Sequence, residues 1–155
     1  MLKVRAVGTR VPAWVEAACD DYLRRCDRGL PLQLETISAA SAGRGADPVR
    51  VMAAEGAQLL GGVPAGAQVI ALAVAGTAFD SRTLAQRLEH WLGHGPTVLL
   101  IGGANGQSPQ CLERAQLHWS LSALTLPHLL VRVLVLEQLY RAYSILRGLP
   151  YHLGH

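Results

Sequence analysis

The residues of this chain best suited to ligand chemistry are three glycines in the stretch LLIGGANGQ, residues 99–107. An apolar run that ends in clustered glycines can bring backbone close to a ligand, often one that carries phosphate. The spacing is neither G-x-G-x-x-G nor a lysine-bearing phosphate loop, and a dinucleotide fingerprint would follow the first strand, where only Gly8 stands. Spacing alone therefore leaves two interpretations of Gly102, Gly103 and Gly106: a ligand-binding loop, or simple turns.

Two other segments resemble this loop in composition and in their place after a predicted strand. In open α/β sheets, ligands bind beyond the carboxyl ends of the strands. Residues 72–76, 102–106 and 121–126 all stand at such ends, and all are small or apolar, without an acidic residue to hold a ribose hydroxyl. Backbone polar groups between apolar walls suit an adenine ring.

The histidines and cysteines do not have the spacing of a metal site. His90 and His94 are four residues apart, but no third ligand is nearby and Gly93 interrupts the helix. Cys19 and Cys26 are seven residues apart in a predicted helix, so their Cα atoms lie about 10 Å apart, beyond disulfide reach. We expect no bound metal and three reduced cysteines.

Size and hydrophobicity indicate one folded domain over residues 1–155. Half of the residues are hydrophobic and 16% are charged, which argues against disorder. The longest apolar runs, 69–75 and 129–136, are shorter than the about 20 residues that span a bilayer, and the second contains Arg132. The N-terminus lacks the apolar region of a signal peptide. We expect a cytoplasmic protein without a membrane segment.

The charge is compatible with an anionic partner. The net charge is +3, and only one of the 14 basic residues, Lys3, is a lysine. Arginine makes bidentate phosphate contacts and stacks on bases, so the composition permits nucleic-acid binding without requiring it.

Hydrophobic periodicity predicts alternating strands and helices. The expected strands are residues 2–8, 30–37, 67–75 and 97–103. A short fifth strand is expected in residues 118–126, which lead into a loop. The expected helices start at Pro12, at Asp47-Pro48, at Asp80 or Ser81, at Ser108-Pro109 and at Pro127, and the last ends at Gly148. Trp14, Ala18, Tyr22 and Leu23 form the apolar stripe of the first helix, and residues 38–47 suggest a mobile loop. This order predicts an α/β fold with a mostly parallel sheet flanked by helices.

Three stretches of the chain resemble a known family. LLIGGANGQSP, WSLSALTLPHLLVRVLVLEQLYRAYSI and the terminal PYH are similar to the ribosomal large-subunit pseudouridine N3-methyltransferases, which belong to the SPOUT class of methyltransferases. AVGTR near the start and YLRRC on the first helix extend the similarity over nearly the whole chain. The resemblance implies a C-terminal trefoil knot, which general rules of topology would not have suggested.

The same resemblance implies a ligand and partners. It implies S-adenosylmethionine as cofactor, large-subunit rRNA as substrate, and a homodimer in which each active site is completed across a two-fold interface. Gly103 would let backbone approach the cofactor without a Cβ. The cofactor-binding positions implied are Leu72, Gly103, Ser122, Ala123, Leu124, Thr125, Leu126 and Pro127. The last helix also carries more apolar residues than one stripe needs: Leu129, Leu130, Val133, Leu134, Leu136, Leu139, Tyr140 and Tyr143.

The chain departs from the family pattern in three places. Ala104-Asn105 stands where similar proteins commonly have Pro-Glu, and residues 77–79 read Thr-Ala-Phe where lysine and tryptophan are frequent. Leu153 replaces a basic residue of the tail. These departures concern RNA contact more than the cofactor.

The implied reaction needs the imide proton of the pseudouridine to leave N3. His152 is the candidate base or orienting group, and Arg141 is the candidate phosphate contact or stabiliser of the imide anion. A tail residue without a role and a solvated helix charge are the alternatives for these two. We expect the tail, residues 150–155, to fold over a cofactor pocket, its own or that of a partner subunit.

Two other functions fit parts of the sequence. A non-enzymatic ribosome-binding factor could use the same basic surface, and a nucleotide-dependent oxidoreductase could use the glycine loop. The second is weakened by the missing ribose-binding acid.

Overall fold

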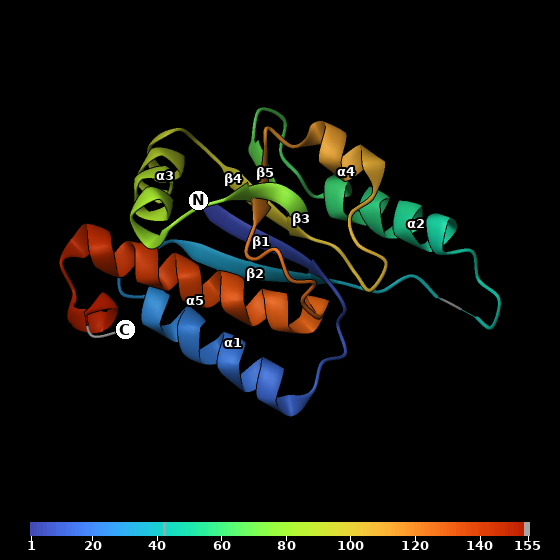
Figure 1. Cartoon of the computed structure of the whole chain (residues 1–155), viewed down its shortest axis with the longest axis horizontal. Helices are drawn as coiled ribbons and strands as arrows, with labels where there is room; N and C mark the ends of the chain where they lie inside the picture. The colour runs from blue at the N-terminus through green and yellow to red at the C-terminus, as the bar shows by residue number, and fades with distance from the viewer. Residues whose placement is uncertain (42, 154–155) are drawn as a thin grey trace.

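A five-stranded sheet with helices on both sides makes up the structure, a computed structural model that describes residues 1–41 and 43–153 (Figure 1). The strands are β1 (Leu2–Val7), β2 (Leu32–Ile37), β3 (Gln68–Ala78), β4 (Thr97–Ile101) and β5 (Leu117–Ser120). The helices are α1 (Ala13–Cys26), α2 (Pro48–Gly61), α3 (Ser81–Gly93), α4 (Pro109–Arg114), α5 (His128–Arg147) and the 3₁₀ turn η1 (Pro150–His152).

All strand pairs in the sheet are parallel, and the order is β2-β1-β4-β3-β5. The first strand therefore lies inside the sheet and pairs with both β2 and β4. Leu2 pairs with Leu32 on one side and with Thr97 on the other. The predicted α/β fold with a parallel sheet is confirmed.

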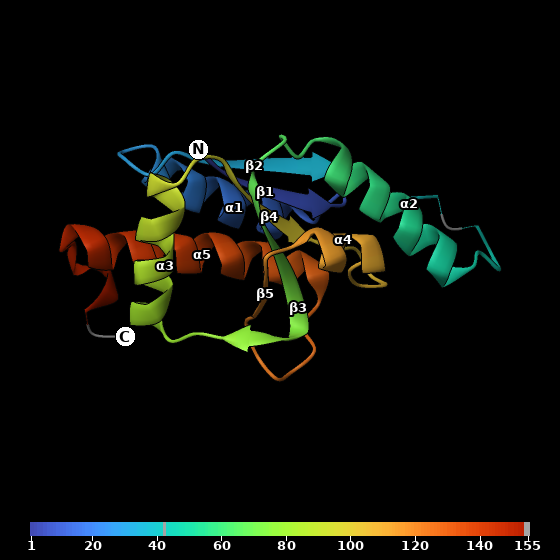
Figure 2. The same ribbon diagram turned by 90° about the horizontal axis from the view of Figure 1, so that it is seen from above.

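The strands are apolar because helices cover both faces of the sheet. Alternate residues of β4 point to opposite sides: Leu99 and Ile101 join the core under α1, α3 and α5, whereas Val98 and Leu100 join the core under α2 and α4. Figure 2 shows the two groups of helices on either side of the strands. A continuous apolar run is what such double coverage requires.

Capping residues start the helices where the sequence predicts. The side chain of Asp47 accepts a hydrogen bond from Val49 N, that of Asp80 from Thr83 N, and that of Ser108 from Cys111 N. Pro48 and Pro109 occupy the first turns of α2 and α4. Gly148 ends α5 with φ of 64°, a left-handed conformation that favours glycine.

Two sequence expectations are wrong in detail. Trp14 does not face the core: it is 58% exposed, and the buried residues of α1 are Val15, Cys19 and Cys26. The apolar run after Gln68 is not covered throughout, because β3 shifts its register between Leu72 and Thr77 and its second half is exposed. The bend allows β3 to pair twice with the short β5 and opens a space where the strand turns away.

The remaining expectations concern the cysteines, membrane-spanning helices, metal ligands and the loop of residues 38–47. The three cysteines are free and buried. No helix in residues 1–41 or 43–153 is long and apolar enough to cross a membrane, and no group of three potential metal ligands occurs there. The predicted mobile loop contains residue 42, which lies outside the described residues.

Candidate functional site

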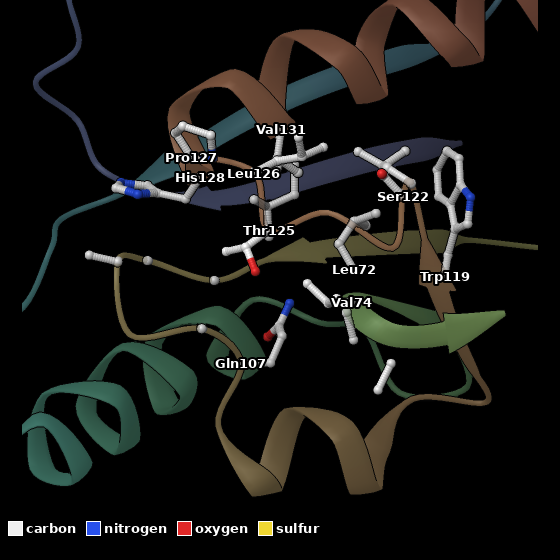
Figure 3. Close-up of a pocket in the computed structure, with 18 of the residues that line it drawn as sticks. Leu72, Val74, Gln107, Trp119, Ser122, Thr125, Leu126, Pro127, His128 and Val131 are labelled. Carbon is white, nitrogen blue, oxygen red and sulfur yellow. The ribbon is translucent and has the colours of Figure 1, made fainter. Parts of the chain in front are cut away.

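A cavity of about 670 Å³ opens at the carboxyl ends of β3, β4 and β5 (Figure 3). Its walls come from residues 72–75, from residues 101–104, 106 and 107 of the glycine segment, from residues 121, 122 and 124–127, from Leu112 and Trp119, and from the first turn of α5. The cavity is within the usual size range of small-molecule sites, and its walls are mainly apolar. The three strand ends selected from the sequence thus surround one space.

Seven of the eight cofactor positions implied by the sequence line this cavity. They are Leu72, Gly103, Ser122, Leu124, Thr125, Leu126 and Pro127. Ala123 is exposed at the turn of the segment and is not among the lining residues.

The glycine segment is a tight turn. Gly103 O accepts a hydrogen bond from Gly106 N at 3.0 Å, and the left-handed residue is Gly106, with φ of 86°. Gly103 does not have a positive φ, yet a Cβ there would lie only 2.6 Å from Oε2 of Glu55. A Cβ at Gly102 would lie 2.5 Å from Gly106 O. Glycine is thus required at 102 and 103 by close packing of the turn.

Local hydrogen bonds fix the loop between β5 and α5. Ser120 Oγ donates to Ser122 O at 3.0 Å, and Leu124 N donates to Ser122 Oγ at 3.0 Å. This turn holds Leu124 at 71% exposure beside the cavity. An apolar side chain left so exposed by its own chain fits a wall that a ligand covers.

The sequence-predicted catalytic candidates lie at the other end of α5 from the cavity. His152 Nδ1 is 3.0 Å from Ser144 Oγ, and Arg141 pairs with Glu137 at 2.6 Å. Ser144 is sixteen residues after His128, which is about 24 Å along a helix. Figure 1 shows η1 beside the far end of α5, away from the carboxyl ends of the strands. Within one chain, these residues do not meet the cavity.

The tail packs firmly on its own helices. The hydroxyl of Tyr151 donates to Glu137 Oε1 at 3.1 Å and lies 3.2 Å from the hydroxyl of Tyr22, and its ring meets that of Tyr140 edge-on at 4.8 Å. Burial, followed by the hydrogen bond with Tyr22, raises the pKa of the Tyr151 phenol, so it is protonated at neutral pH. The Arg141 guanidinium lies 5.1 Å from the same ring. The tail, as far as residue 153, is therefore an ordered surface.

Three polar residues near the cavity were not identified from the sequence. Glu55 is 5% exposed and Arg132 is 2% exposed, and His128 lines the cavity at the start of α5. A signal for Glu55 existed: it lies between Val51 and Leu59 at four-residue spacing, on the buried stripe of α2.

This chain belongs to the SPOUT methyltransferase family. The family model described as "Predicted SPOUT methyltransferase" matches residues 1–152, and membership implies the C-terminal trefoil knot. The protein is therefore an enzyme of the methyltransferase class, and neither a nucleotide-dependent oxidoreductase nor a non-enzymatic binding factor describes it.

Curated relatives narrow the comparison further. The chain is 45% identical over 152 residues to the ribosomal RNA large subunit methyltransferase H of Alkalilimnicola ehrlichii, covering 97% of each chain. It is equally similar to the proteins of that name from Chromohalobacter salexigens and Hahella chejuensis, of which it covers 98% and 97%.

S-adenosylmethionine is the methyl donor of this family, and the cavity suits it. Glycine backbone and apolar side chains offer surfaces for a nucleoside, and Ser122 and Thr125 add hydroxyl groups. Gln107 donates through Nε2 to Leu100 O at 2.6 Å, while its buried Oε1 has no partner among the described residues. In Figure 3 this side chain points from the glycine turn toward Thr125 with its amide nitrogen foremost, while the unpartnered oxygen is buried behind the cavity wall.

Proposed function

We propose that this protein transfers a methyl group to N3 of a pseudouridine in large-subunit rRNA, acting in the cytoplasm as one domain over residues 1–155. The observation that carries the proposal is 45% identity over 97% of the chain to relatives named as large-subunit rRNA methyltransferases. The net charge of +3 and the predominance of arginine are consistent with an RNA substrate.

The chain's own residues supply binding and orientation in this reaction. S-adenosylmethionine supplies a methyl group already activated by a sulfonium. We propose that Leu72, Gly103, Leu126 and the loop of residues 122–125 hold the cofactor through backbone groups and apolar contact, with Pro127 closing the wall. A fixed in-line geometry then lowers the barrier without a metal.

Methylation of ribosomal particles tests this proposal. Large subunits from cells that lack the modification are incubated with the enzyme and labelled S-adenosylmethionine, and the modified nucleoside is identified by mass spectrometry. We expect one methyl per particle, on N3 of a pseudouridine. Particles made without pseudouridine are the control, and equal labelling of both would contradict the assigned base.

We propose further that the enzyme works as a homodimer in which α5 packs antiparallel on the partner's α5. Leu130 and Leu134 are half-buried, and the core cluster formed by the described residues does not include them, so this face of the helix is available for a partner subunit. A two-fold axis near Gln138 would bring the tail of one subunit to the α5 N-terminus of the other. His152 and Arg141 would then reach the partner's cavity as orienting and anion-stabilising groups.

A charge on this face is expected to separate the subunits. Leu134→Arg would place an unpaired guanidinium in the apolar contact, which is strongly unfavourable. We expect a monomer at micromolar concentration in sedimentation, with methyl transfer lost and the fold intact. Val49→Arg is the control, because Val49 is 64% exposed on α2. A wild-type enzyme that is monomeric and fully active would contradict the dimer.

A further inference from the structure

The cavity contains one titratable side chain among its lining residues, and that side chain is His128. Its imidazole comes from the first residue of α5, directly after Pro127. In Figure 3 it lies at one end of the cavity, and Trp119 lies at the opposite end. Among the described lining residues, His128 is therefore the side chain able to accept a proton from a molecule in the cavity.

Two buried charges of opposite sign act on this imidazole from different elements. Arg132, one turn further along α5, donates from Nη2 to Val7 O at 2.8 Å and to Gly8 O at 2.9 Å. Glu55, on α2, accepts from Ala40 N at 3.2 Å through Oε1. Its Oε2 is buried, has no hydrogen-bond partner among the described residues, and faces Gly103 in the cavity wall.

The balance of these effects keeps His128 neutral. Burial, and then the Arg132 charge, lower the pKa of the imidazole below its usual 6.5, while the Glu55 carboxylate opposes them. At neutral pH the ring therefore has a free lone pair. When it gains a proton, the Glu55 carboxylate favours the cation.

We propose that His128 is the group that accepts the N3 proton of the target base, and that Glu55 is a positioning residue that stabilises the imidazolium formed. The proposal rests on the proposed function. In this step the N3–H bond breaks and its proton passes to His128, the N3 lone pair forms the bond to the methyl carbon, and the C–S bond breaks with its electron pair going to sulfur. His152 of the partner subunit then keeps an orienting role only.

The test compares His128→Gln with the matched control His90→Gln, a change of an exposed histidine on α3. Single-turnover methylation of large subunits is measured from pH 5.5 to 9.5 at saturating cofactor. The wild-type rate should rise with pH through an apparent pKa below 6.5 and then level. His128→Gln should be slower at pH 7 by about 10²-fold or more, the loss expected for a positioned acid–base group. Its rate should keep rising with pH, because hydroxide in solution then removes the imide proton.

A second measurement does not depend on activity. Titration of the histidine ring protons by NMR, with the His128 signal assigned from its loss in His128→Gln, should give a pKa below 6.5. Glu55→Gln should lower that pKa further, because it removes the opposing negative charge. It should also reduce the methylation rate less than His128→Gln does. A Glu55 that only supports the fold would leave the His128 titration unchanged.

Calorimetry with S-adenosylhomocysteine separates the other outcomes. We expect His128→Gln to bind it as tightly as the wild type does. A large loss of affinity, with a normal rate at saturating cofactor, would assign His128 to cofactor binding and overturn the proposal. A normal rate at pH 7 would overturn it as well. A wild-type enzyme that binds the cofactor but methylates no ribosomal particle would instead refute the proposed function.

Discussion

Removal of residues 151–155 is expected to lower methyl transfer by about 10²-fold or more, with dimerisation and most of the cofactor affinity retained. The deletion removes Tyr151, which bridges Tyr22 and Glu137, and with it the support of Arg141. It also removes His152 from its contact with Ser144. None of these residues lines the cavity of its own chain, so cofactor binding should be preserved.

Point variants identify which part of the tail is responsible. His152→Ala keeps the Tyr151 packing and should reproduce most of the loss if the imidazole orients the target base. Tyr151→Phe removes only the hydroxyl and should have a smaller effect. Leu153 is 66% exposed, and Leu153→Ala is the control. Normal methylation by the truncated enzyme would show that the tail has no part in the reaction.

Gly103→Val is expected to abolish measurable cofactor binding, through displacement of the glycine turn. The valine Cβ would lie 2.6 Å from Glu55 Oε2 and 3.1 Å from a methyl group of Val7. The valine must displace either the glycine turn, toward the cavity, or the Glu55 side chain. Overpacking of this kind typically lowers the free energy of unfolding by about 1–3 kcal/mol. Calorimetric titration with S-adenosylhomocysteine should show affinity reduced at least about 10²-fold in a protein with a normal circular dichroism spectrum.

A second substitution tests the cause of that loss. In Gly103→Val/Glu55→Ala the carboxylate is absent, so the valine gains room behind the turn and part of the affinity should return. Gly93→Val serves as the control, because a Cβ at the end of α3 meets nothing within 4 Å. If the double variant binds no better than Gly103→Val, the valine side chain must obstruct the ligand directly.

Local chemistry explains why much of the fold could be predicted. Asp47, Asp80 and Ser108 cap helices through bonds to nearby backbone, and such bonds depend on adjacent residues only. The buried strands were visible as short apolar runs. The order of the strands in the sheet could not be predicted, because it depends on pairs such as Leu2 with Thr97, which are far apart in the chain.

Only those parts of the candidate site whose walls are made of backbone and small residues could be predicted from the sequence. Glycines and small residues after strands mark the cavity walls through their own composition. Arg132 gave no such signal, because a guanidinium inside an apolar helix normally reaches solvent, whereas here it meets the carbonyls of Val7 and Gly8. The exposure of Trp14 was missed because the hydrophobic pattern of α1 does not distinguish a core-facing stripe from a surface one.

The position of β1 between β2 and β4 has a consequence during synthesis of the protein. This strand is made before the other four strands, yet its neighbour β4 begins only at Thr97, and α5 with the cavity wall follows later still. A nascent chain can pair β1 with β2 early but must wait for β4 before the other edge of β1 is covered, and pairing between segments so far apart in sequence slows folding. Stalled chains that end before residue 97 should be protease-sensitive throughout. The cofactor site would thus form only after α5 has been synthesised and has left the ribosome.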